Sequence, residues 1–472
     1  MDVSPRAGDL VGAGANRGAV LNGLRVCVVG LGRAGIGMAV ALKRSGAFVH
    51  AVDEKSGDAP EMIQAGDRLG ALDILMQTDW TGSLDFDLLD ALAVSPGVPR
   101  DHPAIRGALA SGKAVWGEME VAYRVTRSPI VAITGTNGKS TVTALTWHIL
   151  RVANKGAHLC GNIAGAGLGE RAIGEVAASS AQDEFLIAEV SSFQLEWVDE
   201  FRPSVATITN ITPDHLDRYA TFEEYAQTKH RVFAQMREND VAVLSRLHPE
   251  TIPDSKVKCR TLYVGGSADD ASVSDSGVAF AGGAMIEAKD VPLMGKHNLE
   301  NVAVAGLLAR ASGAPWAAVE EGVRTFRGLA NRMEIVADVD GVRYINNSMC
   351  TNPDALRASV SAISNGVRLL AGGISKAPRA SDFRGVLPAN VKAAYLFGRD
   401  GDALAEQFRS DGIECYVFET MDTAFDAARH DAQRGEVVLL SPGCASFDQF
   451  SSFEERGERF RACVLTLMEA AR

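Results

Sequence analysis

The sequence is poor in the features that mark disulfide frameworks, cysteine-based metal sites and membrane spans. Its seven cysteines are scattered over 472 residues, and no two are spaced as a CxxC pair. This excludes a disulfide framework and a cysteine zinc site, and it suits a reducing compartment. No apolar run approaches a membrane span, and the N-terminal residues lack the basic start and apolar core of a signal peptide. We therefore predict a cytoplasmic protein with no membrane partner.

Positively charged residues are also fewer than negatively charged ones. The chain has 47 lysines and arginines against 59 aspartates and glutamates, so its net charge is −12. This balance argues against nucleic acid as a partner. A nucleotide can still bind, because helix termini and single lysines decide that locally. We expect a monomer that binds small molecules.

Length and patterning predict an α/β protein of about three domains. With 46% hydrophobic residues, the chain has ample material for several cores. Strand and helix patterns alternate along it. We predict a mobile leader (1–21), a Rossmann-like domain (22–125), a central P-loop ATPase-type domain (126–327) and a C-terminal Rossmann-like domain (328–472).

The most informative stretch lies at the start of the predicted central domain. Residues 130–133 form a short apolar run typical of a buried parallel strand, 134–138 offer turn chemistry, and Lys139 opens a helical pattern. This order cradles phosphates, because backbone N–H groups and the helix dipole converge on the anion. Lys139 adds a positive charge, and the Ser140 hydroxyl suits Mg²⁺. Ile133 stands where the usual G-x-x-x-x-G-K-[ST] has its first glycine, so we predict a variant phosphate loop; the alternative is an ordinary turn with a surface lysine.

A second glycine-rich turn lies near the N-terminus. A predicted strand (24–29) runs into Gly30-Leu-Gly-Arg-Ala-Gly35, a helix (36–45) and a strand that ends at Asp53. This is the dinucleotide fingerprint, with an acidic residue about 20 positions further on. NAD is the direct interpretation, a nucleotide diphosphate is a broader one, and a ligand-free turn is the third. A further strand is expected near 86–94, before the rigid loop Ser95–Pro99.

Three ionisable residues of the central domain follow from strand and helix patterns. Glu189 ends a predicted buried strand, and a buried glutamate is costly unless it is paired or holds a metal. We predict a Mg²⁺ ligand there, with a surface carboxylate as the alternative. His215 follows the strand 205–210 and suits metal, phosphate or ribose contacts, or a purely structural role. Lys229, on a predicted helix (222–236), has the pattern of a solvated charge.

The remaining patterns concern helix starts and the C-terminal domain. Asn298 precedes a helix (299–311), where it could contact a ligand or cap the helix. A hairpin (335–345) turns at Asp340–Gly341. Strands at 367–371, 393–397, 415–418 and 437–440 then alternate with helices.

These parts suit an ATP-driven ligase. Such an enzyme needs a site for ATP, one for a carboxylate and one for an amine. An acyl phosphate hydrolyses unless water is excluded, so domain closure is expected.

Seven motifs resemble those of the Mur ligase family, from about Leu24 to the C-terminus. They are TGTNGKST (134–141), GN (161–162), EVSSFQLE (189–196), NITPDHLDR (210–218), GKHNLEN (295–301), NRMEIV (331–336) and LSPGCASFDQF (440–450). Together they are highly specific. SSFQLE, GRD at Gly398 and CASFDQF are most similar to the branch that joins D-glutamate to UDP-N-acetylmuramoyl-L-alanine.

The resemblance implies roles for individual residues. The UDP part of the substrate, rather than NAD, would bind Gly30, Leu31, Gly32, Arg33, Ala34, Gly35, Asp53, Lys55, Ser95, Pro96, Gly97 and Asn162. ATP would bind Gly135, Thr136, Asn137, Gly138, Lys139, Ser140, Thr141, Asn298, Asn301, Arg332 and Asn347. Glutamate would bind Thr351, Lys376, Ser446 and Phe453. Two Mg²⁺ sites would use Ser140, Glu189, His215 and Lys229, the last as N6-carboxylysine, and the catalytic residues would be Lys139, Glu189, His215 and Lys229.

One segment departs from the family pattern. Members usually carry N-D-S-K-A-T-N, whereas this chain has Asn347 in place of the aspartate and Met349 in place of the lysine. Asn331 also stands where a histidine is common. One hypothesis is therefore a divergent ligase that uses L-glutamate or another amino acid. A nicotinamide-dependent oxidoreductase and a non-catalytic nucleotide-binding relative stay open as alternatives from other classes.

Overall fold

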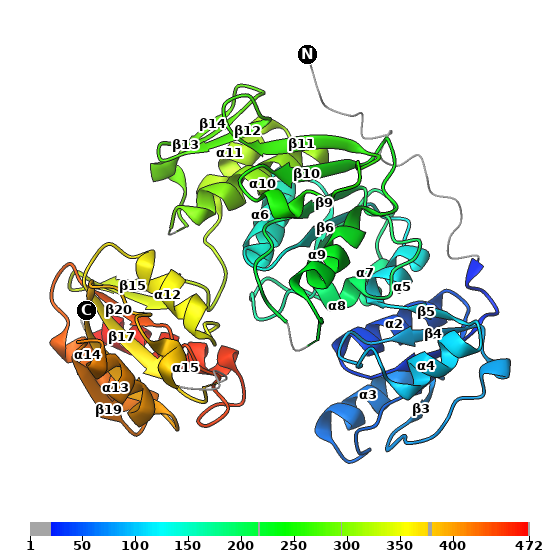
Figure 1. The fold of residues 1–472 in the computed structure, drawn as a ribbon, viewed down its shortest axis with the longest axis horizontal. Coiled ribbons are helices and arrows are strands. Elements are labelled where there is room, and N and C mark those ends of the chain that lie inside the picture. The colour runs from blue at the N-terminus through cyan, green and yellow to red at the C-terminus, as the bar shows by residue number, and fades with distance from the viewer. Residues whose placement is uncertain (1–19, 216–217, 294, 376–379, 471–472) are drawn as a thin grey trace. The chain divides into compact units, whose positions relative to one another are not determined.

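The protein folds around three separate β-sheets, each with helices packed on it (Figure 1). The computed structural model describes residues 20–215, 218–293, 295–375 and 380–470. No helix within these residues is long and apolar enough to cross a membrane. Residues 1–19 of the predicted leader lie outside the described part. The predicted α/β class is confirmed.

The N-terminal sheet has five parallel strands in the order β3-β2-β1-β4-β5. The strands are β1 (Arg25–Val29), β2 (Phe48–Val52), β3 (Leu75–Gln77), β4 (Ala91–Val94) and β5 (Ala114–Trp116). The helices are α2 (Arg33–Arg44), α3 (Pro60–Gly70), α4 (Pro103–Ala110) and α5 (Glu118–Val125). The chain order reverses between β1 and β4, and loops at the carboxyl ends of two such strands form a ligand crevice in open sheets of this kind.

The central sheet has nine strands in the order β14-β13-β12-β11-β10-β9-β6-β8-β7. Those strands are β6 (Ile130–Thr134), β7 (Ala157–Gly161), β8 (Phe185–Glu189), β9 (Val205–Ile208), β10 (Val241–Ser245), β11 (Arg260–Gly265), β12 (Ala271–Ser274), β13 (Gly277–Phe280) and β14 (Met285–Glu287). The strands from β12 to β7 pair in parallel, whereas β13 and β14 pair antiparallel. The strands β6, β8 and β9, in the middle of the parallel part, are buried throughout and mostly apolar, as strands covered on both faces must be.

The helices of the central part are α6 (Lys139–Val152), α7 (Ile173–Ala177), α8 (Ser192–Leu195), α9 (Phe222–His230), α10 (His297–Ala311) and α11 (Trp316–Thr325). Helices α6, α10 and α11 pack against one another. This packing brings the start of α10 beside the start of α6, although more than a hundred residues separate them in the chain.

The C-terminal sheet has six strands in the order β15-β16-β20-β17-β18-β19. They are β15 (Glu334–Val339), β16 (Val342–Asn346), β17 (Val367–Gly372), β18 (Val391–Phe397), β19 (Cys415–Phe418) and β20 (Val437–Leu440), with helices α12 (Pro353–Ser361), α13 (Gly401–Ser410), α14 (Met421–Asp431) and α15 (Phe453–Ala470). Only β15 is antiparallel, and its hairpin with β16 is the predicted one. Loops after β16, β17 and β20 therefore share one edge of the sheet.

Two predicted elements differ from the observed ones. The strand expected near 86–94 is a short 3-10 turn at Phe86–Leu88 followed by β4, because the Asp85 side chain accepts a hydrogen bond from the Asp87 N–H and closes the turn. The helix expected over 222–236 ends at His230 and continues as a 3-10 turn, Arg231–Phe233. The Arg231 side chain donates to the carbonyls of Glu196 and Val198, which holds this turn in place.

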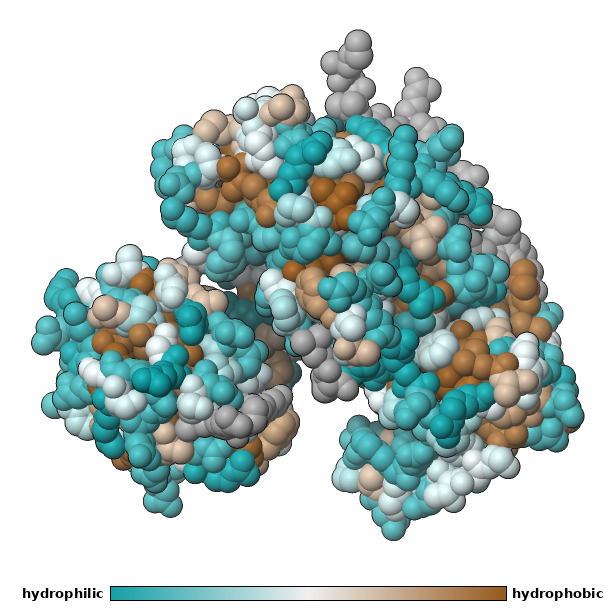
Figure 2. All heavy atoms as spheres, in the orientation of Figure 1, coloured by the Kyte–Doolittle hydropathy of each residue, from teal (hydrophilic) through white to brown (hydrophobic). Residues whose placement is uncertain are grey.

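The chain divides into two compact units. The first comprises residues 1–164, 168–291 and 297–326, and the second comprises 165–167, 292–296 and 327–472. The first two sheets thus belong to one unit and the C-terminal sheet to the other. On the face drawn in Figure 2, polar residues predominate and apolar residues stand in separate groups, as is usual for protein surfaces. The three domain bounds given above stay a prediction.

A buried carboxylate ties the first sheet to the second within the first unit. Glu120, on α5, is fully buried. It accepts hydrogen bonds from the backbone N–H groups of Asp199 (2.8 Å), Glu200 and Phe201 (2.9 Å), and from Arg124 (2.7 Å). The charged form is thus satisfied on several sides, as a buried carboxylate requires.

Replacing Glu120 by alanine is expected to lower the free energy of unfolding by about 3 kcal/mol, because three backbone donors and Arg124 lose their buried acceptor. Urea unfolding measures the change. The control is Glu238→Ala, which removes an exposed carboxylate of the same unit and should leave the midpoint unchanged. Equal midpoints for both variants would contradict this account of Glu120.

Candidate functional site

The glycine-rich turn after β6 has the backbone geometry of an anion site. Gly135 has φ +142° and Gly138, the N-cap of α6, has φ +79°, so both adopt conformations that L side chains rarely take. No side chain caps α6. Its first N–H groups and the positive end of its dipole are therefore oriented toward the turn, where a phosphate binds. The predicted order of strand, turn and helix is present.

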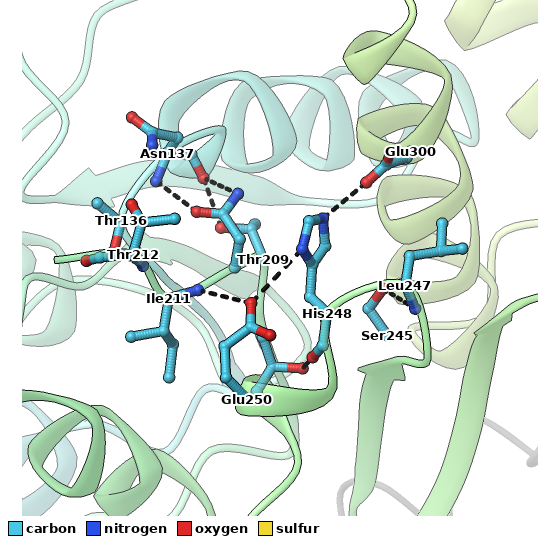
Figure 3. Close-up of polar contacts among 12 residues, drawn as sticks. Thr136, Asn137, Thr209, Ile211, Thr212, Ser245, Leu247, His248, Glu250 and Glu300 are labelled. Carbon is cyan, nitrogen blue, oxygen red and sulfur yellow. Dashed lines mark hydrogen bonds and ion pairs between the residues drawn. The ribbon is translucent and has the colours of Figure 1, made fainter. Parts of the chain in front are cut away.

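The loop after β9 supports this turn from the side (Figure 3). The Asn210 carbonyl accepts from the Thr136 N–H (2.9 Å), and the Asn210 side-chain oxygen accepts from the Asn137 N–H (2.9 Å). Thr209 donates its hydroxyl to the Asn137 carbonyl at 2.5 Å. The turn is thus held in shape by its neighbour, which is what electrostatic preorganisation requires.

Two lysines point at carbonyls of the same turn. Lys139 Nζ donates to the Thr136 carbonyl and Lys229 Nζ donates to the Gly135 carbonyl, both at 2.9 Å. Lys229 is only 2% exposed, and its ammonium lies 4.5 Å from the centre of the Tyr225 ring. Burial lowers the pKa of Lys229 well below its usual range, and the charge of Lys139 lowers it further.

The surface-charge interpretation of Lys229 is therefore wrong. Tyr225 and Lys229 stand four positions apart on α9, so they share the helix face that packs inward. Burial on this face disfavours the charged form of the Lys229 amine, which is how a lysine becomes a better nucleophile. The sequence offered only one physical indication of this: the aromatic and the lysine lie at helical spacing.

Glu189 and Ser140 form a buried polar pair next to the turn. Glu189 is 3% exposed and Ser140 is 4% exposed. The Ser140 hydroxyl donates a hydrogen bond to the Glu189 carboxylate. Asn162, on the loop after β7, donates its amide to the other carboxylate oxygen at 2.9 Å. The alternative of a surface carboxylate at Glu189 is wrong. A hydroxyl and a carboxylate beside a phosphate turn are the hard oxygen donors that Mg²⁺ prefers, so these residues fit the ion.

His215 lies apart from that pair. It has φ +52°, its side chain is 44% exposed, and its ring lies 4.8 Å from the Phe193 ring and 3.6 Å from Asp214. Within the described residues no hydrogen bond or ion pair joins it to Glu189, and no group of three or more His, Cys, Asp or Glu side chains could hold a metal. The structure thus brings Ser140, Glu189 and Asn162 together but leaves the role of His215 a prediction.

The first turn of α10 supplies two buried amides. Asn301 donates to the Asn298 side-chain oxygen at 2.8 Å, and both residues are less than a tenth exposed. A Cβ built on Gly138 would lie 2.6 Å from the Asn301 oxygen. Asn301 therefore sits directly against the phosphate turn, where only glycine leaves room for it.

The N-terminal glycine turn is closed on itself by Asp53. That carboxylate accepts from the Leu31 N–H (2.5 Å) and the Lys55 N–H (2.9 Å). Gly30 has φ +86°, and a Cβ on Gly35 would lie 1.8 Å from the Gly30 carbonyl oxygen, so both positions require glycine. Asp53 thus fixes the shape of the turn. The backbone amides of the turn are the groups that can bind a diphosphate.

The other predicted sugar-nucleotide residues surround this turn. Arg33 donates to the carbonyls of Gly161 (2.9 Å) and Ile163 (3.0 Å), on either side of Asn162. Lys55 forms an exposed ion pair with Glu61 at 2.7 Å. The remaining residues are Gly32 at the N-cap of α2, Ala34 within α2, and Ser95, Pro96 and Gly97 in a turn closed by the Val98 N–H.

The predicted residues of the second unit lie on loops at one edge of the C-terminal sheet. Asn347 accepts from the Met333 N–H (3.2 Å) and donates to the Ser441 hydroxyl (3.1 Å). The others are Arg332 in the loop before β15, Thr351 just before the α12 N-cap, buried Ser446 after β20 and Phe453 as the first residue of α15. Lys376 lies outside the described residues. Asn347 fits its neutral partners, a donor N–H and a hydroxyl that can accept.

Sequence reasoning missed a histidine beside the phosphate turn (Figure 3). His248, after β10, contacts Glu300 on α10 through Nε2 (2.8 Å) and Glu250 through Nδ1 (3.5 Å). Glu250 in turn accepts from the Ile211 N–H at 3.4 Å. The hydrogen bond to Glu300 and the charges of both glutamates raise the pKa of His248, against burial. Through these two glutamates, His248 links the loop after β9 to the first turn of α10.

The two glutamates should make the contribution of His248 to stability depend on pH. Its pKa in the folded protein lies above the unfolded value of about 6.5. The contribution is therefore fully present below about pH 6.5 and is lost as the pH rises through the folded pKa. We expect His248→Gln to lower the urea midpoint near pH 6 but not at pH values above the folded pKa. His430→Gln, which removes a side chain 86% exposed, is the control; a pH-independent effect of His248→Gln would contradict the assignment.

Known protein families match two parts of this chain. The Mur ligase middle domain matches residues 133–309, and the Mur ligase, glutamate ligase domain matches residues 331–444. The UDP-N-acetylmuramoylalanine–D-glutamate ligase of Pelotomaculum thermopropionicum is 37% identical over 456 residues, which are 94% of this chain and 98% of that relative. The chain belongs to the Mur ligase family.

A second relative and two solved structures are also similar to this chain. The enzyme of the same name from Myxococcus xanthus is 36% identical over 469 residues, 95% of this chain and 99% of the relative. The crystal structure of the UDP-N-acetylmuramate–alanine ligase MurC from Thermotoga maritima superposes with a TM-score of 0.60 at 19% identity, over 94% of this chain and 99% of that one. A pseudomurein peptide ligase type C from Methanothermus fervidus gives 0.56 at 16% identity, over 94% and 100%. The two structures show the same fold.

Membership in the Mur ligases confirms the predicted family and makes the chain an ATP-dependent ligase. The family gives no support to a nicotinamide-dependent oxidoreductase, the direct interpretation of the N-terminal fingerprint.

Proposed function

We propose that this Mur ligase joins D-glutamate to UDP-N-acetylmuramoyl-L-alanine at the expense of ATP, in cytoplasmic synthesis of peptidoglycan precursors, and that it acts as a monomer. The name shared by its relatives over nearly the whole chain supports these substrates. The observation that carries the proposal is the phosphate turn itself, with Lys139, the buried Ser140–Glu189 pair and Asn301 gathered around it.

The reaction has two steps. A carboxylate oxygen of the alanyl group attacks the γ-phosphorus of ATP, ADP leaves, and an acyl phosphate forms. The amine nitrogen of glutamate then attacks the acyl carbon, loses a proton, and expels inorganic phosphate as the amide forms. Most of the barrier to the first step is repulsion between a carboxylate and a triphosphate, so positioning and positive charge are the main contributions of the protein.

The residues of the turn account for that contribution. The N–H groups at the start of α6 bind phosphate oxygens, and the Lys139 ammonium turns from the Thr136 carbonyl to the terminal phosphate. Asn298 and Asn301, in the first turn of α10, contact ATP beside the phosphate turn. Arg332 and Asn347 are the other two residues that we assign to ATP. Ser140, Glu189, His215 and Lys229 as N6-carboxylysine would hold Mg²⁺ at two sites, and the ion would neutralise phosphate charge there.

The sugar nucleotide and the amino acid are assigned to the other loops. The N-terminal turn, Gly30 to Gly35, binds the diphosphate through its backbone amides, and Ser95 to Gly97 with Asn162 line the path of the sugar. Thr351, Ser446 and Phe453, with Lys376, place the incoming amino acid. Asn347 and Met349 are the specific reason to test a second candidate, a ligase for L-glutamate or another amino acid, because a carboxylate and a positive charge common in the family are absent there.

Assays with purified enzyme, ATP and UDP-N-acetylmuramoyl-L-alanine decide between the two candidates. D-glutamate, L-glutamate, D-aspartate and L-alanine are offered separately, and amide product and phosphate are measured. Exclusive turnover with D-glutamate is expected; robust turnover with another member of the panel would favour the divergent ligase. In the same assay Lys139→Ala should lower kcat by about 100- to 1,000-fold, whereas Lys258→Ala, an exposed lysine of the same unit, should not. An active Lys139→Ala enzyme would overturn the assignment of the turn.

The buried amine of Lys229 supports its conversion to N6-carboxylysine. The nitrogen attacks CO₂, a proton is released, and the side chain becomes an anion that can serve a second Mg²⁺. A peptide containing Lys229 should carry the mass of one added CO₂, measured without acid, while one containing the exposed Lys258 should not. Activity should fall in CO₂-depleted buffer and return with bicarbonate; full activity with unmodified Lys229 would contradict the conversion.

A further inference from the structure

One arginine of the second unit is buried without an acidic partner. Arg456, on α15, is 0% exposed and is the largest fully buried side chain among the described residues. Within that part of the chain it forms no ion pair, and its Nη1 has no hydrogen-bond partner although it is shielded from solvent. An unpaired buried charge and an orphaned donor both cost stability, so their retention calls for a functional reason.

The rest of the guanidinium joins two loops. Its Nε donates to the Ser348 hydroxyl (3.0 Å), and its Nη2 donates to the carbonyls of Ser348 (2.8 Å) and Cys444 (3.1 Å). Ser348 extends this network to the start of α15, because its hydroxyl donates to the Phe453 carbonyl at 2.7 Å. Arg456 therefore holds together the loop after β16, the loop after β20 and the start of α15.

The orphaned Nη1 faces a third loop. A Cβ built on Gly373, in the loop after β17, would lie 3.3 Å from Nη1. Gly373 has φ +118°, and its N–H donates to the Phe397 carbonyl, so its backbone is committed to a shape that only glycine adopts easily. One guanidinium thus underlies all three loops at the carboxyl edge of this sheet, which is the edge where open α/β sheets bind ligands.

The charge of Arg456 persists at neutral pH. Burial lowers its pKa to about 10, opposed by Cys350, Cys444 and Asp448. The two thiols are themselves buried and neutral, since burial raises the pKa of Cys444 to about 12 and that of Cys350 as well. Asp448 is the one acid among these neighbours, and its carboxylate accepts from the Arg399 N–H at 2.9 Å. Asp400, the acid on the loop after β18, pairs with Arg399 at 3.3 Å. Arg456 is thus left without an ion pair among the described residues.

The loops after β16 and β20, which Arg456 joins, and the start of α15, which Ser348 joins to them, each carry a residue assigned above to the amino acid. Thr351 follows Ser348 by three positions, Ser446 follows Cys444 by two, and Phe453 precedes Arg456 by three. We propose that Arg456 is the positioning residue of the amino-acid site and that its uncompensated charge makes this site prefer an acidic amino acid to a neutral one. This inference rests on the proposed function and adds to it the physical source of the substrate class.

Two substitutions separate the charge from the hydrogen bonds. Arg456→Met removes both, and Arg456→Lys keeps a charge but loses the fork that reaches Ser348 and Cys444. We expect both to raise the KM for glutamate about tenfold, with an unchanged KM for ATP. Discrimination between glutamate and glutamine, measured by turnover or by competitive inhibition, should fall about tenfold in Arg456→Met and persist in Arg456→Lys. Arg461→Met is the matched control on the same helix, since Arg461 pairs with Glu334 at 2.8 Å.

A merely structural role would give a different result. It would lower activity with both amino acids alike, or change the KM for ATP as well, and either result overturns the proposal. If Arg456→Met does not fold, Arg456→Lys decides alone: an unchanged KM for glutamate overturns the proposal, and a raised one with retained discrimination supports it. If the unmodified enzyme uses an amino acid other than glutamate, the proposed function fails separately. Arg456 then predicts that the amino acid in use is still acidic, and a neutral one overturns it.

Discussion

The proposed phosphate site depends on a backbone turn whose shape is held by neighbouring segments. The amides at the start of α6 become an anion site only while Gly135 and Gly138 keep conformations unfavourable for other residues. Asn210 and Thr209 hydrogen-bond the turn, Lys229 donates to the Gly135 carbonyl, and Asn301 occupies the space that a side chain on Gly138 would need. The nine-stranded sheet serves to bring these distant segments to one place.

The same logic explains why buried ionisable groups collect around the two sets of loops. Glu189 is stabilised by Ser140 and Asn162, whereas Lys229 and Arg456 keep donors in surroundings that disfavour their charge. Structural carboxylates such as Glu120 are instead saturated by backbone donors. A buried charge that is fully satisfied stabilises the fold, and one that is left partly unsatisfied is available to a ligand.

Much of the fold could be predicted from the sequence, because strands β6, β19 and β20 and the hairpin of β15 and β16 are encoded by local apolar runs and turn residues. The phosphate turn could be predicted for the same reason, since its chemistry needs residues that are adjacent in the chain. The burial of Lys229 could not be predicted, nor could the contacts of His248 with Glu300 and of Arg456 with Cys444. All three depend on segments that are not adjacent in the sequence. The start of the strand expected near 86–94 was wrong for a local reason. The hydrogen bond from the Asp87 N–H to the Asp85 side chain forms a 3-10 turn at Phe86–Leu88 instead.

The reach of Arg33 has a consequence for how the two sheets of the first unit communicate. Its guanidinium, from the turn assigned to the sugar nucleotide, grips the carbonyls on both sides of Asn162, and Asn162 in turn holds the carboxylate of Glu189 beside the ATP turn. Three side chains thus connect the two glycine-rich turns that we assign to nucleotides through hydrogen bonds. Whatever free energy one occupant spends or gains in shifting these side chains must appear, with equal size, in the affinity for the other.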